Sequence, residues 1–144
     1  MSHVVKGKLI IQDMQACEMA AKALGLTLVK GAKTYAWFGR SVGDYPLPEG
    51  MTAAELGHCE HKLVLPGCEY EVGLIKRKNG PGYEAIFDFF GPGQELEAKL
   101  GRGCEKFRQE YTASLAMLHY QAEGYEVTRE VDAKSGQVVV TARR

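Results

Sequence analysis

Apolar and polar residues follow one another along this chain with the periods of strands and helices. Residues 4–11 alternate between apolar and basic side chains, which predicts a strand. Asp13 is a favourable N-cap residue, and apolar positions then recur at helical spacing as far as Gly25, so we expect a helix between these two residues. Residues 26–30 predict a second, short strand. The chain therefore opens as a β-α-β unit.

The segment from Gly31 to Gly57 interrupts this regularity. One helical turn is expected at residues 52–56, because Thr52-Ala-Ala-Glu55 matches the capping-box pattern. Irregular loops of this length inside a compact domain are uncommon, and they are usually either functional or disordered. Aromatic side chains favour partial order in this segment, which contains Tyr35, Trp37, Phe38 and Tyr45 along with five glycines and two prolines.

The second half of the chain returns to regular patterns. Residues 58–65 predict a strand, and residues 68–88 predict a hairpin around the turn Asn79-Gly80-Pro81-Gly82. Apolar side chains then recur in steps of three and four from residue 94 to about residue 122, which predicts one long amphipathic helix. Gly101 and Gly103 lie off its apolar stripe and can kink its first turns. A last hairpin is expected from residues 125–131 and 137–142.

The predicted order of elements is β-α-β, a long loop, β-β-β, α and β-β. Two helices with one apolar stripe each are buried most economically against one face of a mainly antiparallel sheet. We therefore predict an α+β fold, namely a ferredoxin-like sandwich with two helices on one face, extra strands and a long inserted loop. It is expected to form a single domain over residues 1–144, with the irregular loop at about residues 31–57.

Composition narrows the class of protein. The chain has 144 residues, of which 45% are hydrophobic and 25% charged, as in an average globular domain. Eighteen basic residues balance eighteen acidic ones, which argues against a protein that coats nucleic acid or an anionic membrane. Neither a signal-peptide pattern nor a membrane-spanning run is evident, and the four cysteines lack a paired spacing. We expect a cytoplasmic protein with free, mostly buried thiols.

Several short motifs resemble a known family. Those motifs are Met1-Ser2-His3 before the first strand, Tyr70-Glu71-Val72-Gly73-Leu74, Phe89-Phe90-Gly91, Glu110-Tyr111-Thr112-Ala113-Ser114-Leu115, Glu123-Gly124-Tyr125-Glu126-Val127 and the terminal Arg143-Arg144. Together they resemble the family of the hypothetical chloroplast reading frame thirty-five, a group of small proteins in plastids, cyanobacteria and phages. The resemblance covers most of the chain. It implies no catalytic residues, because the family is one of unknown function. This chain departs from the pattern by an apparent insertion between about Ser41 and Leu56.

Only one stretch concentrates metal-ligand residue types. It is His58-Cys59-Glu60-His61, with Cys68 nearby, and zinc commonly takes four such ligands. If the stretch is a strand, however, His58 and His61 point to opposite faces, so that only two ligands could share an ion. His58, His61 and Cys59 are therefore weak metal candidates, and polar strand residues are the preferred interpretation. We expect no metal and no cofactor.

The irregular segment holds the strongest candidates for a binding surface. Trp, Tyr and Arg side chains concentrate binding energy at interfaces. The alternative is that these rings fill the interior beneath the loop, which we favour for Phe38 and also weigh for Trp37. The residues expected to contact a partner or ligand are Tyr35, Trp37, Arg40 and Tyr45, with Lys33 beside them.

Nucleic-acid binding and catalysis are less well supported. Lys76-Arg77-Lys78 at the hairpin tip, with Arg143 and Arg144, could contact phosphate. An RNA-binding sheet, however, needs aromatic side chains on its open face. The predicted open face instead carries charges of both signs, at Lys6, Lys8, Glu60, Lys62, Glu71, Glu84 and Asp88.

A cysteine nucleophile is also not supported by the sequence. Cys17 and Cys104 lie on apolar helix stripes, where a thiol is inert.

Three functions follow from these observations, in order of preference. The first is a non-enzymatic binding or adaptor module, which presents the Gly31–Gly57 segment or an open sheet edge to a protein partner, including a second copy of itself. The second is a small-ligand protein that holds an anion or nucleotide between the aromatic loop and Arg40 or Lys33. A metal-dependent enzyme ranks last, for want of a convergent set of ionisable residues.

Overall fold

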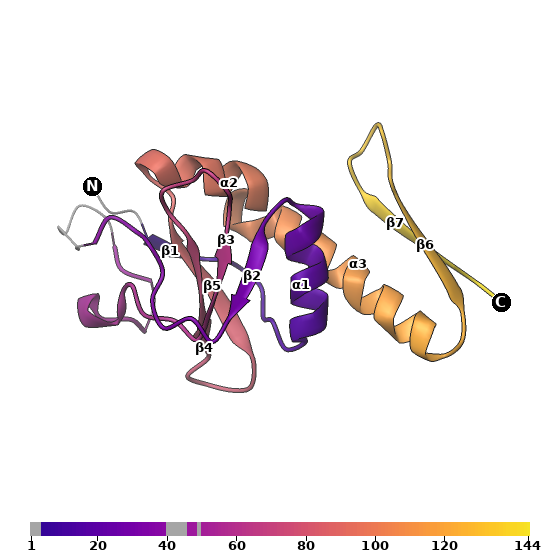
Figure 1. Ribbon diagram of the computed structural model, residues 1–144, viewed down its shortest axis with the longest axis horizontal. Coiled ribbons are helices and arrows are strands. Elements are labelled where there is room, and N and C mark those ends of the chain that lie inside the picture. Colours follow the sequence, from indigo (N-terminus) through magenta and orange to yellow (C-terminus); the bar gives the residue numbers. More distant parts are fainter. Residues whose placement is uncertain (1–3, 40–45, 49) are drawn as a thin grey trace.

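The computed structural model describes residues 4–39, 46–48 and 50–144. Its main sheet has five antiparallel strands in the order β1-β5-β4-β3-β2 (Figure 1). The α+β class with a mainly antiparallel sheet is confirmed, whereas the ferredoxin-like topology is not, because β1 and β2 occupy the two edges of this sheet. The strands are β1 (Val4–Lys6), β2 (Thr27–Lys30), β3 (His61–Val64), β4 (Val72–Lys76) and β5 (Tyr83–Asp88).

Three helices of the described chain pack on one face of this sheet: α1 (Met14–Ala23), α2 (Gln94–Leu100) and α3 (Glu105–Ala122). Asp13 caps α1 as predicted, since its carboxylate accepts a hydrogen bond of 2.9 Å from the amide of Ala16. The phenol oxygen of Tyr111 on α3 accepts hydrogen bonds from the amides of Gln12 and Asp13, at 2.9 and 3.0 Å. These two bonds tie α3 to the start of α1. None of the helices in these ranges is long and apolar enough to cross a membrane.

The prediction of one continuous helix from residue 94 to residue 122 is wrong. The chain bends between α2 and α3, where Gly101, Gly103 and Cys104 have positive φ angles of 82°, 64° and 63°. A right-handed helix cannot continue through such residues, and a short 3-10 turn at Arg102–Cys104 joins the two parts. The two glycines that lay off the apolar stripe therefore break the helix. The stripe nevertheless continues across the bend, because Leu96, Leu100, Cys104 and Phe107 all lie in the same core.

The opposite face of the sheet is covered rather than open. Tyr35 and Leu56 from the irregular segment pack against Val4 and Ile86 of the sheet, forming a second, smaller core. Asp88, predicted to lie on an exposed polar face, is fully buried. The reason is that the irregular segment folds back across the strands, so the molecule has three layers: helices, sheet and loop.

The last hairpin forms as predicted but does not join the main sheet. Strands β6 (Glu126–Val131) and β7 (Val138–Arg143) make a separate two-stranded antiparallel sheet. Figure 1 shows this hairpin alongside α3, on the far side of α1 from the five-stranded sheet. The chain therefore ends in a projection beyond the main body.

Candidate functional site

A groove of about 1160 Å³ runs over the loop-covered side of the sheet. One side is formed by residues 4–10, which include β1, and another by residues 75–79 with Glu84, at the tip of the β4-β5 hairpin. Described residues at 46–48 and 50–55 of the irregular segment, and residues 58–60 directly after it, complete the lining. The groove thus exists only because this segment folds back onto the sheet.

Positive charge predominates in the groove. Among the residues that the structure describes, five cationic side chains line it, from Lys6, Lys8, Lys76, Arg77 and Lys78, against three carboxylates, from Glu55, Glu60 and Glu84. Two of these carboxylates already have cationic partners, since Lys6 lies 3.7 Å from Glu84 and Lys78 lies 2.9 Å from Glu55. Within the ranges that the structure describes, Lys8 and Lys76 form no ion pair. A chain of zero net charge therefore concentrates a local positive excess here.

The hairpin tip is fastened to the irregular segment across the groove. The Lys78 ammonium donates hydrogen bonds to the carbonyl of Gly50 and to the Glu55 carboxylate. The same carboxylate accepts hydrogen bonds from the amide and hydroxyl of Thr52, at 2.9 and 3.2 Å. The predicted capping box is therefore confirmed, although the turn that follows it is a 3-10 helix (Ala53–Glu55). One carboxylate thus caps this turn and holds Lys78.

Tyr35 lies inside the molecule, not on its surface. Its side chain is only 4% exposed, so the expectation that this ring is displayed to a partner is wrong. Burial raises the pKa of its phenol to about 12. The ring can pack there because it lies directly against Gly73 of β4, where any side chain would collide with it.

The other residues predicted in the irregular segment are not gathered into one surface. Trp37 is half-buried against the smaller core, with its indole nitrogen beside Gly57. Lys33 is exposed, and neither Lys33 nor Trp37 lines the groove. Arg40 and Tyr45 lie outside the described residues.

The three metal candidates are separated by the sheet. His58 and Cys59 line the groove. His61 accepts a hydrogen bond of 2.9 Å at Nδ1 from the amide of Gly31, and its ring packs edge-on against Tyr83 beside the helix-side core. In the part of the chain that the structure covers, no three His, Cys, Asp or Glu residues are grouped so as to hold a metal ion.

The cysteine in the groove is a poor nucleophile. Burial raises the pKa of the Cys59 thiol to about 11, and its sulfur donates a hydrogen bond of 3.5 Å to the carbonyl of Ala32. Cys17 and Cys104 are fully buried, and desolvation raises the pKa of each to about 12. All four cysteines are free thiols, as predicted.

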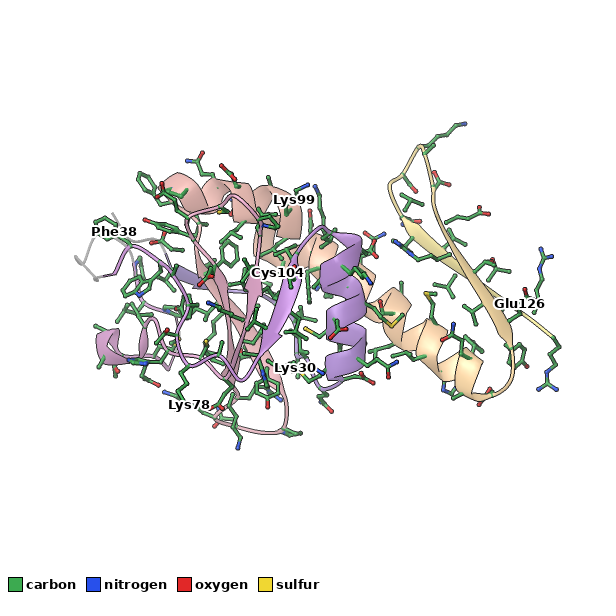
Figure 2. All side chains as sticks on the ribbon, in the orientation of Figure 1. Lys30, Phe38, Lys78, Lys99, Cys104 and Glu126 are labelled. Atoms are coloured by element: carbon green, nitrogen blue, oxygen red, sulfur yellow. The ribbon has the colours of Figure 1, made fainter. Side chains whose placement is uncertain are left out.

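The sequence pointed to part of the groove and missed the rest. The sequence predicts a basic tip at Lys76-Arg77-Lys78 and groups it with Arg143 and Arg144. Figure 2 shows Lys78 on the opposite side of the molecule from Glu126, the strand residue that pairs with Arg143. Lys8 cannot be recognised as a groove residue from the sequence. A basic residue in an alternating strand is ordinarily a surface residue, and only the folded chain places other groove residues opposite it.

Comparison with protein-family models, with curated proteins and with solved structures finds no match for this chain. The resemblance to the chloroplast reading-frame family therefore stays a prediction. The case for function depends on the geometry and charge of the groove.

Proposed function

We propose that this protein is a non-enzymatic binding module whose groove takes an acidic segment of a protein partner. The observation that carries the proposal is the excess of cationic side chains among the described residues that line the groove of a neutral chain. Lys8 and Lys76 are both exposed and stand outside the ion pairs that occupy Lys6 and Lys78. Carboxylates of a partner would supply the missing negative charge.

The size and lining of the groove favour a peptide over a small molecule. Small-molecule pockets commonly measure about 300–1,000 Å³, whereas this groove has about 1160 Å³. Apolar side chains contribute to its lining, among them Leu47, Met51 and Ile75. A segment that alternates acidic and apolar residues would satisfy both features. This proposal differs from the preferred prediction from the sequence, because its recognition surface comprises groove residues at 46–48, 50–55 and 58–60 with the sheet and not the ring of Tyr35.

Fluorescence anisotropy with labelled peptides tests this proposal. An extended peptide of alternating Glu and Leu is expected to bind, and a peptide with Lys in place of Glu is not. The Lys8→Glu/Lys76→Glu variant should weaken binding at least about tenfold, because each reversed charge replaces an attraction by a repulsion. Lys134→Glu, in the terminal hairpin, is the matched control and should bind as the wild type does.

Two results would contradict the proposal. One is equal binding of the Glu and Lys peptides. The other is an equal loss of binding in the groove variant and the Lys134→Glu control. A nucleoside triphosphate is the alternative ligand. If it binds more tightly than the acidic peptide, and if the groove variant loses that binding, the ligand of the groove is a small anion and not a peptide.

A further inference from the structure

The last thirty residues form a projection without a core of its own. Residues 115–144 comprise the second half of α3 with β6 and β7, and we call them the C-terminal arm. None of these residues is buried. Half of the large hydrophobic side chains that are exposed in the described chain lie in the arm, at Leu115, Tyr120, Val131 and Val139. Val131 and Val139 are 58% and 51% exposed.

The arm is nevertheless held in a definite position. Arg129 on β6 donates to both carboxylate oxygens of Glu110 on α3, at 2.7 and 2.8 Å. Gln109 of α3 donates to the carbonyl of Gly136 in the hairpin turn, at 3.3 Å. The hairpin face that carries Arg129 therefore lies on α3, while the other face, with Val139, points away. A two-stranded hairpin with one face exposed is marginal in water by itself.

The surface area of the chain is larger than that of a typical monomer. The accessible surface measures 8397 Å² for a chain of 15.8 kDa. A folded monomer of this mass exposes about 7,300 Å², so the surplus is about 1,100 Å². A standard interface buries about 800 Å² on each partner. The surplus is therefore of the size that one subunit contact would remove.

Charge on the arm fits a second copy of the same arm. Residues 115–144 carry four basic and four acidic side chains, which gives no net charge. In a two-fold dimer the same patch meets itself, so a patch of one sign would repel its copy. The hairpin face that points away from α3 also carries both signs, from Glu126, Glu130 and Arg143. We propose that the C-terminal arm is a dimerisation element that packs against the arm of a second copy of this chain.

Light scattering coupled to size-exclusion chromatography tests the proposal on the full chain. The wild type is expected at twice the chain mass of 15.8 kDa. Val139→Lys/Thr141→Lys places two charges on the hairpin face that points away from α3 and should shift the protein to the monomer mass. Val29→Lys is the matched control, because Val29 is an exposed valine on β2 of the main sheet, and it should remain dimeric.

Hydrogen exchange provides a second measurement that needs no variant. Amides of β6 and β7 should gain protection in the wild type as the protein concentration rises, while amides of β3 and β4 should not change. A monomeric wild type at every concentration would overturn the proposal. So would a dimer that survives the double substitution in the arm. Peptide binding in the groove is measured separately, and neither result depends on the other.

Discussion

The ring of Tyr35 lies directly against Gly73, in the place that a side chain on β4 would otherwise occupy. A Cβ atom built on Gly73 would lie 2.6 Å from Cε1 of this ring, closer than real Cβ contacts come. Gly73 has an ordinary strand conformation, so close approach of the ring, not backbone freedom, requires glycine here. This contact fixes the irregular segment on the sheet and thereby forms one wall of the groove.

Gly73→Ala should therefore destabilise the protein. Overpacking a core by one methyl group commonly costs about 1–3 kcal/mol, because neighbouring groups are forced from their preferred positions. We expect a loss in that range in urea denaturation, together with weaker peptide binding, since the loop wall of the groove depends on the Tyr35 ring.

The Tyr35→Ala background is the control for this interpretation. Removal of the ring makes space for the alanine methyl group, so Gly73→Ala should cost less there than in the wild type. An equal cost in both backgrounds would mean that the collision with Tyr35 is not the cause.

The ion pair between Arg129 and Glu110 should control how firmly the terminal hairpin is held. The side chains of Arg129 and Glu110 are 33% and 11% exposed, so this ion pair is intermediate between an exposed pair and a buried pair. Arg129→Met should accordingly cost about 1–2 kcal/mol, because it leaves the Glu110 carboxylate without its cation. Hydrogen exchange should show faster opening of β6 and β7, with the five-stranded sheet unchanged.

Arg143→Met is the matched control for that prediction. Arg143 also lies in the hairpin and is exposed, but it makes no ion pair within the described residues. The Arg143→Met variant should show hydrogen exchange rates in β6 and β7 close to those of the wild type. If both substitutions loosen the hairpin equally, the Glu110 contact does not hold it.

Local signals were enough to predict most of the elements. Asp13 and Gly25 mark the two ends of α1. The Asp13 carboxylate accepts a hydrogen bond from an amide of the first turn, and Gly25, with a φ of 80°, adopts the left-handed conformation that ends the helix. Thr52 and Glu55 formed their capping box for the same local reason. Such features depend on neighbours within a few positions, which a sequence shows directly.

Long-range packing accounts for what the sequence did not predict. Exposure of Tyr35 was a wrong prediction, because its burial depends on Gly73, thirty-eight positions away, having no side chain. The groove likewise combines residues 4–10 with residues 75–79, and no local period links them. The last hairpin also forms a sheet apart from the five-stranded one, and no local pattern in the sequence indicates where it packs.

The four thiols should differ in reactivity according to their burial. Desolvation raises the pKa of Cys17 and Cys104 to about 12 and that of Cys59 to about 11, and it also raises the pKa of Cys68. Since the thiolate is the reactive form, alkylation of the native protein at pH 8 should be slow at all four.

Mass-spectrometric mapping of the alkylated protein checks this order. Cys17 and Cys104 should be modified only after unfolding, whereas the half-buried Cys59 and Cys68 should react first. Rapid labelling of Cys104 in the native protein would contradict the packing of this thiol against Gly7.

Acid should release the clamp between Lys78 and Glu55. The pKa of Glu55 is lowered from its ordinary value of 4.5, mainly by the hydrogen bond from Lys78, so the folded state favours the carboxylate. Its stabilisation is present above pH 4.5 and is lost as the pH falls through the lowered value. The Tm of Glu55→Gln should therefore lie below that of the wild type at neutral pH and converge with it in acid. Glu95→Gln, on α2, should show no such convergence, and a pH-independent gap for Glu55→Gln would exclude the ion pair as its source.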